Sequence, residues 1–266
     1  DVVDDTQNVV SLSKDDVVLD IGGNDGTMLG LIKQPLRARV NIDAAAGVVQ
    51  TVTDSDYQHI HAPFTADIYN KLDLPKPKLI TCVAMFYHLS DPLSFCRNVY
   101  DIMADDSVFV IQMTYLGTML RDNIFDNIVH EHAVYYSLAS LEHLLSKVGL
   151  HIGEARLVKS YGGSLRVFIV KSTERFPKEH WRKDYAEIQR FEMENHTNTF
   201  EALYAFNSRT QLLRDSISAI VDHIVQQQGP LLGFGASTKG NMILQYLGIK
   251  SDRMSGILDN NSKKIG

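Results

Sequence analysis

Short apolar runs alternate with helical patterns along the chain. The run at 17–21 is typical of a strand buried on both faces, and a glycine-rich loop and a helical pattern follow it within the segment 15–32. The segment 229–247 repeats this order, because leucines and Phe234 precede Gly235 and another helical pattern. Further strand candidates lie at 38–42, 78–84, 107–113 and 165–171, and helical patterns at 92–103, 137–148 and 208–226.

Strands that alternate with helices predict an α/β fold with a mostly parallel, doubly wound sheet. The composition changes after Lys171, since charged residues are frequent over 173–206 and no convincing strand occurs there. We therefore expect an α/β domain over 1–174, a helical connector over 175–228 and the beginning of a second, Rossmann-like domain over 229–266.

Composition and charge exclude several classes of protein. The 266 residues are 44% hydrophobic and 22% charged, as in ordinary globular proteins. No apolar run approaches the ~20 residues of a membrane span, and the acidic start does not resemble a signal peptide. A net charge of −6 without a basic block makes nucleic acid and anionic membranes poor partners. Because only Cys82 and Cys96 occur, neither a disulfide framework nor a four-cysteine zinc site can form, and we expect a cytoplasmic protein.

The first glycine loop, LDIGGNDGT, indicates a ligand other than a dinucleotide. Glycine permits a tight turn and the close approach of a ligand, but a dinucleotide site needs the different spacing Gly-x-Gly-x-x-Gly. Asp20 and Asp25 would repel a diphosphate, so the loop suits a ligand with a cationic end, such as S-adenosylmethionine with its ammonium and sulfonium groups. The expected cofactor contacts in this loop are Asp20, Gly22, Gly23, Asn24 and Gly26.

Two residues beyond the loop extend the predicted cofactor site. Asp43 ends the second expected strand, where a carboxylate can accept hydrogen bonds from both ribose hydroxyls. Phe64 follows the expected third strand region, where an aromatic ring could flank adenine. The alternatives are a plain strand–turn–helix with acidic residues at the helix start, and a core position for Phe64. Because Asp43 lies at the end of the second expected strand, at the right distance after the glycine loop, the nucleotide-site pattern of a methyltransferase is the better interpretation.

The segment NIVHEHAVYYSL (127–138) concentrates ionisable side chains, because His130, Glu131 and His132 are consecutive. Two histidines could be metal ligands or surface residues, but no nearby cysteine or histidine would complete a metal site. A general base needs one histidine whose tautomer is held by a neighbouring group, and Glu131 could do this for His132.

Five motifs, VLDIGGNDGTML, FYHLSDP, FDNIVHEHAVYYSL, YGGSLRVF and GASTKGN, occur in the order seen in the sugar C-methyltransferases, and the chain resembles that family from Val17 onward. These enzymes methylate carbon 3 of nucleotide-linked 4-keto deoxysugars. The resemblance implies a class I methyltransferase fold, catalysis by Glu131 and His132 with His132 as the base, and another active-site histidine at His88. It also implies that the second domain helps to hold the nucleotide-sugar.

The chain departs from the family pattern in three ways. It has Val129 where the family has tyrosine, which removes a hydroxyl from the expected active site. It lacks the four-cysteine zinc module that begins family members, and it stops where the family's C-terminal domain continues.

The chemistry that these residues allow is proton abstraction next to a ketone. His132, paired with Glu131, would remove the hydrogen from carbon 3, and the enolate carbon would attack the methyl group of the sulfonium. No metal is required, because the sulfonium is already an activated donor. The enolate oxygen needs a hydrogen-bond donor, for which His88 and Tyr115 are candidates.

Other residues are assigned to the acceptor. Gly163 and Ser164 would open space at the pocket while Arg166 points toward an anion, or the glycines merely turn a hairpin. Lys239 and Asn241 would cradle a diphosphate at a helix start, or belong to a structural loop with a solvated lysine. The expected substrate contacts are Tyr115, His130, Gly163, Ser164, Arg166, Lys239 and Asn241.

Three functions remain open from the sequence. The first is S-adenosylmethionine-dependent C-methylation of a nucleotide-linked keto-deoxysugar. The second is O- or N-methylation of another small molecule, for which the same His132 would serve. The third is a protein that binds S-adenosylmethionine or a nucleotide-sugar without catalysis, which Val129 suggests.

Overall fold

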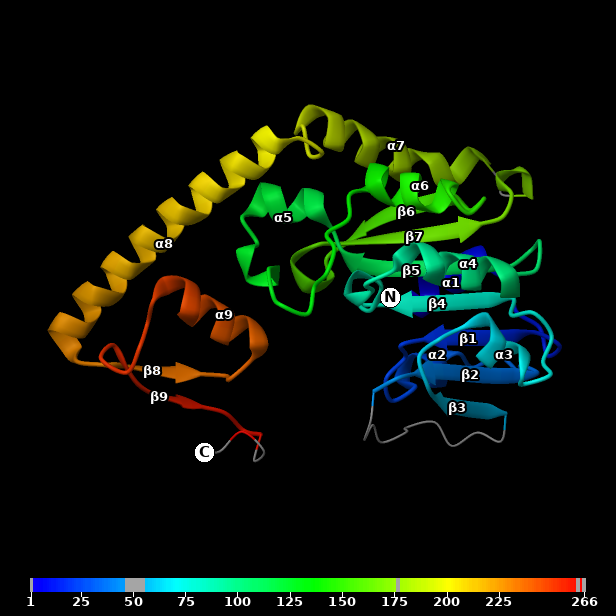
Figure 1. Ribbon diagram of the computed structural model, residues 1–266, viewed down its shortest axis with the longest axis horizontal. Helices are drawn as coiled ribbons and strands as arrows, with labels where there is room; N and C mark the ends of the chain where they lie inside the picture. The colour runs from blue at the N-terminus through cyan, green and yellow to red at the C-terminus, as the bar shows by residue number, and fades with distance from the viewer. Residues whose placement is uncertain (1, 46–55, 176–177, 262–263, 265–266) are drawn as a thin grey trace. The chain divides into compact units, whose positions relative to one another are not determined.

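The computed structural model describes residues 2–45, 56–175, 178–261 and 264 (Figure 1). The chain divides into two units, and each is described by itself. Unit 1 consists of Asp1–Tyr115 and Ala133–Glu194, and unit 2 consists of Leu116–His132 and Asn195–Gly266.

Unit 1 is built on a seven-stranded sheet in the order β3-β2-β1-β4-β5-β7-β6. The pairs from β3 to β5 are parallel, and β7 is antiparallel to both of its neighbours. This order confirms the predicted mostly parallel, doubly wound sheet. The strands are β1 (Val17–Ile21), β2 (Ala38–Asp43), β3 (Tyr57–His61), β4 (Leu79–Val83), β5 (Val108–Thr114), β6 (His151–Val158) and β7 (Ser164–Val170).

Helices cover both faces of this sheet (Figure 1). The side chains of β1 alternate, so that Val17, Leu19 and Ile21 join one core and Val18 joins the other. Residues of α3, α4 and α6 line the first core, and those of α1 and α2 line the second. These helices are α1 (Val2–Val9), α2 (Thr27–Leu31), α3 (Ala66–Asn70), α4 (Pro92–Ile102) and α6 (Leu138–Ser146); short 3-10 helices are η1 (Phe86–His88), η3 (Ser160–Gly162) and η4 (Thr173–Arg175).

The segment predicted as a helical connector is shared between the units. It holds α7 (Lys178–Glu194) and α8 (Phe200–Gln228). Helix α7 packs against β6 and α6, and its Ile188 is buried in the core of unit 1. Helix α8 belongs to unit 2. The first part of the expected connector is therefore a covering helix of the first sheet.

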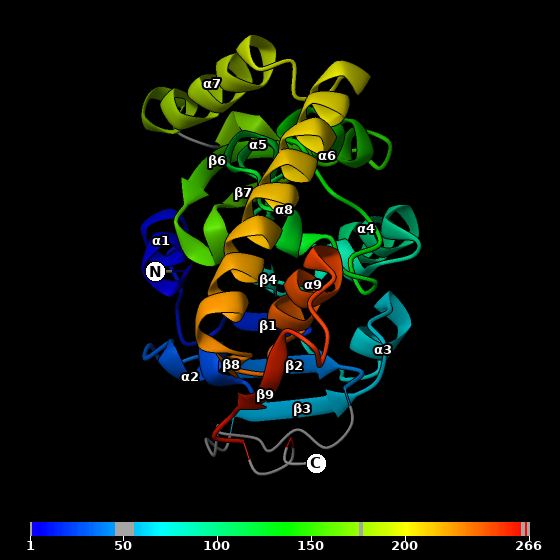
Figure 2. The same ribbon diagram turned by 90° about the vertical axis from the view of Figure 1, so that its left-hand side faces the viewer.

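Unit 2 contains a parallel strand pair and the helices that pack on it. The strand and helix expected around the second glycine loop are present as β8 and α9, and β9 follows them and pairs with β8 in parallel. Figure 2 shows α9 lying against α8, where Ser218 Oγ donates to the Leu247 carbonyl at 3.3 Å and Arg253 pairs with Asp222 at 2.9 Å. The remaining elements are α5 (Leu116–Asp122), η2 (Phe125–Asn127), β8 (Leu231–Phe234), α9 (Thr238–Leu247) and β9 (Met254–Leu258).

Among the residues that the structure describes, no helix has the length and apolar character needed to cross a membrane.

Candidate active site

The loop between β1 and α2 in unit 1 requires glycine at three positions, Gly22, Gly23 and Gly26. Gly22 and Gly26 have φ values of 72° and 80°. A Cβ atom on Gly22 would lie 2.7 Å from Met85 Cγ, and one on Gly23 would lie 2.3 Å from Asp20 Oδ2. The glycines therefore let Met85 and Asp20 pack directly against the loop backbone, and they permit the left-handed turns at Gly22 and Gly26.

Asp20 supports this loop from beneath. Its side chain is buried, and Oδ1 accepts a hydrogen bond from Thr81 Oγ1 at 2.7 Å. Burial raises the pKa of Asp20 to about 7, and the nearby Asp43 carboxylate adds to the shift. A cation bound over the loop would favour the charged form of Asp20, which matches the predicted preference for a cationic ligand.

Asp43 and Asn41 of β2 hold the loop from the side. Asp43 Oδ2 accepts from the Asn24 amide and Oδ1 from the Ala45 amide, both at 2.7 Å. Asn41 accepts from the Gly23 amide at 3.2 Å and donates to the Asn24 carbonyl at 2.8 Å. Each carboxylate oxygen has further acceptor capacity, so Asp43 can still bind ribose hydroxyls. These donors and acceptors fit S-adenosylmethionine.

Two further predicted residues lie after parallel strands of the same sheet. His88 ends η1, which follows β4, and it is exposed with its ring centroid 4.5 Å from that of Tyr87. Phe64 follows β3, is half-buried, and packs edge-on against Phe95 at 5.4 Å. The Tyr87 carbonyl accepts from the Ala133 amide at 2.9 Å. The chain segment after His132 thus re-enters unit 1 beside η1, while the adenine-flanking role of Phe64 stays a prediction.

Tyr115 requires a correction. Its side chain is fully buried, and its hydroxyl donates to Glu192 Oε1 of α7 at 2.8 Å. The same carboxylate accepts from the amides of Leu138 at 2.6 Å and Ala139 at 3.2 Å, at the start of α6. Tyr115 therefore ties α7 and α6 to the sheet, and it is not placed to donate a hydrogen bond to an acceptor.

Arg166 and Ser164 are corrected for the same reason. Arg166 is buried on β7, where its guanidinium donates twice to Gln112 Oε1, at 2.8 and 2.6 Å, and also pairs with Asp5 of α1. The anion that it faces is thus a residue of this chain. Ser164 Oγ donates to the Ser160 carbonyl at 2.9 Å. Gly163, with φ of 117°, lies in the turn between the antiparallel strands β6 and β7, so the glycines turn a hairpin.

In unit 2, His132 has a defined tautomer. Its Nδ1 lies 2.7 Å from the carbonyl oxygen of Asn127, which can only accept, so Nδ1 carries the proton and the lone pair of the neutral ring is on Nε2. His132 is half-buried, whereas Glu131 and His130 are exposed. The Asn127 carbonyl therefore holds the tautomer, while the expected pairing of Glu131 with His132 stays a prediction.

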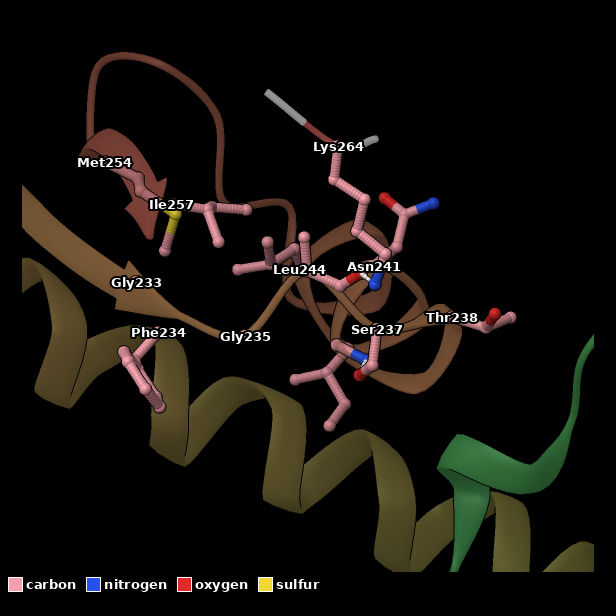
Figure 3. Close-up of a pocket in the computed structure, with 13 residues that line it drawn as sticks. Gly233, Phe234, Gly235, Ser237, Thr238, Asn241, Leu244, Met254, Ile257 and Lys264 are labelled. Atoms are coloured by element: carbon pink, nitrogen blue, oxygen red, sulfur yellow. Dashed lines mark hydrogen bonds between the residues drawn. The ribbon is translucent and has the colours of Figure 1, made fainter. Parts of the chain in front are cut away.

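The second glycine loop, between β8 and α9, borders a cavity of about 560 Å³ (Figure 3). In this view Met254 and Ile257 lie on one side of the cavity, and Asn241 and Lys264 lie on the other. Lys239 follows the loop in the first turn of α9, and its Nζ lies 3.3 Å from Asp126 Oδ2 of η2. The structure therefore brings the predicted residues Lys239 and Asn241 to one end of α9.

Asp259, just after β9, was missed by the sequence reasoning. Its Oδ2 accepts from the Ala236 amide in the glycine loop, and its Oδ1 accepts from the Asn261 amide, both at 2.8 Å. The Gly235 amide donates to the Leu258 carbonyl at 2.7 Å. The signal that could have found Asp259 is an acidic residue directly after the second strand of a glycine-loop unit.

This arrangement repeats the one around Asp43. In unit 1 the Gly22 amide donates to the Ile42 carbonyl at 2.9 Å, and the next residue, Asp43, binds the glycine loop and the amide two residues ahead. We call each arrangement a nucleotide corner: residues 20–26 with Asp43 in unit 1, and residues 233–239 with Asp259 in unit 2. The unit 1 loop carries aspartates, whereas the unit 2 corner is flanked by Lys239 and Lys264.

Comparison with known proteins assigns both parts of the chain. Residues 4–155 match the family described as "Methyltransferase domain", and residues 159–266 match "C-methyltransferase C-terminal domain". C-methyltransferase NovU of Streptomyces niveus is 27% identical over 242 residues, which cover 90% of this chain and 57% of NovU. The chain thus spans little more than half the length of this curated relative.

Solved structures share the fold. One is a chain from a Haloferax volcanii complex between the Trm112 methyltransferase activator and a methyltransferase. It is 14% identical to this chain with a TM-score of 0.51, and the match covers 64% of this chain and 88% of that chain. Another, described as a methyltransferase of Bacillus halodurans C-125, is 11% identical with a TM-score of 0.51. The match covers 64% of this chain and 99% of that chain. With the two matched domains and a seven-stranded sheet of class I order, the chain belongs to the S-adenosylmethionine-dependent methyltransferase family.

Proposed function

We propose that this protein transfers a methyl group from S-adenosylmethionine to a carbon atom of a nucleotide-linked keto-deoxysugar, with His132 as the general base. The observation that carries the proposal is the hydrogen bond from His132 Nδ1 to the Asn127 carbonyl. It gives the neutral imidazole an Nε2 lone pair in a chain of the methyltransferase family.

The cofactor would be held by the nucleotide corner of unit 1. S-adenosylmethionine supplies an electrophilic methyl group on a sulfonium. Asp43 would accept the ribose hydroxyls, Gly22 and Gly23 would shape the loop around the ligand, and Asp20 would provide negative charge beneath it. Phe64 stays a candidate for the adenine ring.

The base chemistry follows from the environment of His132. Nε2 would take the hydrogen from the carbon next to the ketone, and the Asn127 carbonyl would stabilise the imidazolium through the Nδ1–H bond. General-base catalysis of this kind typically contributes about 10²–10⁴-fold. Since Tyr115 is engaged with Glu192, His88 is the better candidate for the donor to the developing enolate oxygen. Glu131 and His130 are exposed beside the base and could contact the acceptor.

Carbon is favoured over oxygen as the methyl acceptor because the matched C-terminal family and NovU are both C-methyltransferases by description. A nucleotide-linked acceptor is supported by the corner of unit 2. Asp259 occupies the position that Asp43 has in unit 1, while Asn241 and Lys264 line the cavity and could bind phosphates. Lys239 lies nearby in the first turn of α9, paired with Asp126. The two corners therefore suit a cationic nucleoside and a phosphorylated one.

The test is to incubate the protein with S-adenosylmethionine and a nucleotide-linked 4-keto-6-deoxysugar, and to follow the product by mass spectrometry. In deuterated water without cofactor, we expect exchange of the hydrogen on carbon 3. Methylation without this exchange would favour transfer to oxygen or nitrogen. Binding of both ligands with neither exchange nor methylation would favour a non-catalytic binding protein.

A further inference from the structure

The turn that fixes the His132 tautomer is η2, and other parts of unit 2 hold it in place. The carbonyl that accepts from His132 Nδ1 belongs to Asn127, the last residue of η2, and Asn127 is almost fully buried. The same carbonyl accepts from the Val129 amide at 3.1 Å, and the His132 amide donates to the Val129 carbonyl at 3.1 Å. The ring of His132 is therefore oriented by η2, and whatever holds η2 also orients the base.

Helix α9 holds η2 by two contacts. Lys239, in its first turn, lies 3.3 Å from the carboxylate of Asp126. Tyr246, in its last turn, packs against Phe125 with ring centroids 4.8 Å apart and ring planes tilted by 40°. Because the two contacts come from opposite ends of the helix and meet adjacent residues of η2, together they fix both the position and the direction of the turn.

Helix α8 supports the same segment. Arg209 donates to Asn123 Oδ1 at 2.8 Å and to the Leu120 carbonyl at 2.5 Å, just before η2. Arg214 lies over the Tyr246 ring, with its guanidinium carbon 5.9 Å from the ring centroid. The Tyr246 ring is thus held between an arginine of α8 and Phe125 of η2.

From these contacts we propose that Tyr246 and the Lys239–Asp126 pair are positioning residues for His132: they fix the turn whose carbonyl selects the tautomer that acts as the base. This rests on the proposed role of His132. It places the orientation of the base under the control of α9, the helix whose first turn also borders the cavity of unit 2. Neither Tyr246 nor Asp126 is required to touch the acceptor.

The tests are Tyr246→Leu and Asp126→Asn, with Tyr246→Phe as the conservative variant. Tyr246→Leu removes the ring that packs against Phe125, and Tyr246→Phe keeps it. Asp222→Asn is the matched control, because Asp222 forms an ion pair of the same kind, with Arg253, elsewhere in unit 2. Each variant is first checked for a native melting temperature, and Asp126→Asn provides the test should Tyr246→Leu fail to fold.

The first measurement needs no substrate. In ¹⁵N-labelled full-length protein, the ring nitrogens of His132 report which nitrogen carries the proton. We expect the Nδ1–H form in the parent, in Tyr246→Phe and in Asp222→Asn, and a mixture of tautomers in Tyr246→Leu and Asp126→Asn. An unchanged Nδ1–H signal in both of the latter variants would overturn the proposal.

The second measurement separates positioning from binding. Because displacements of about 1 Å can cost up to about 10²-fold in rate, we expect Tyr246→Leu to lower kcat about 10- to 100-fold with the KM for S-adenosylmethionine unchanged. A kcat equal to that of Tyr246→Phe would contradict the positioning role. Should the parent methylate no acceptor while the tautomer still shifts in the variants, the proposed function fails but the control of His132 by α9 stands.

Discussion

Replacing Asp43 by asparagine tests the cofactor site most directly, because the structure gives this carboxylate two tasks. It accepts the amides of Asn24 and Ala45 at 2.7 Å, and it is the proposed acceptor for the ribose of S-adenosylmethionine. Asparagine has nearly the same shape but only one acceptor oxygen, so its amide nitrogen would meet a backbone N–H group.

The expected size follows from the bonds that are lost. A hydrogen bond to a charged group contributes about 1.5–3 kcal/mol, so losing one backbone bond should lower the free energy of unfolding by about that amount. Losing the ribose bond should lower the binding free energy by a similar amount. At about 1.4 kcal/mol for each factor of ten, this corresponds to a roughly 10- to 100-fold higher Kd for S-adenosylmethionine.

Isothermal titration with S-adenosylmethionine measures the Kd, and urea denaturation measures the free energy of unfolding. The matched control is Asp259→Asn, which makes the same change in the nucleotide corner of unit 2 and should leave this Kd within about twofold of the parent. If Asp43→Asn binds as tightly as the parent while being less stable, Asp43 only supports the loop and the ribose assignment is wrong.

Three further predictions concern the same two units. In Gly23→Ala the new Cβ would meet Asp20 Oδ2 at 2.3 Å, so we expect about 1–3 kcal/mol lower stability and weaker S-adenosylmethionine binding, measured by denaturation and titration. Because burial raises the pKa of Asp20 from 3.8 to about 7, the native state keeps a proton that the unfolded state loses between these pH values. The free energy of unfolding should therefore fall as the pH rises from about 4 to 7. Asp20→Asn should make the free energy of unfolding depend less on pH over this range. His132→Gln should keep cofactor binding but lower turnover about 10²–10⁴-fold in a methyl-transfer assay, and near-parental turnover would move the role of base to another residue.

The sequence was sufficient for the strands that are buried along their whole length. Every residue of β1, β5 and β7 is buried, and their mostly apolar runs were visible. The edge strand β6 was missed, because HIGEARLV mixes polar and apolar residues and only two of its eight residues are fully buried. Strand β3, the opposite edge, was anticipated only as a region.

Contacts between residues that are close in the sequence could be predicted for the candidate site. Contacts with residues far away in the sequence could not. The glycine loop and Asp43 form one strand–loop–helix–strand unit, so their proximity follows from sequence order. Tyr115 and Arg166 were misplaced because their partners, Glu192 and Asp5, are 77 and 161 residues away. The tautomer of His132 depends on a backbone carbonyl, which leaves no trace in residue type.

The repeated corner has a consequence for how the protein distinguishes its ligands. Both corners use the same kind of bonds, a glycine amide to a strand carbonyl and a loop amide to the following aspartate, so these bonds alone separate nucleoside derivatives poorly. Discrimination then falls to a few side chains, aspartates around one loop and lysines around the other. Electrostatic repulsion should keep each ligand out of the wrong corner, so that neither competes with the other even when both are abundant.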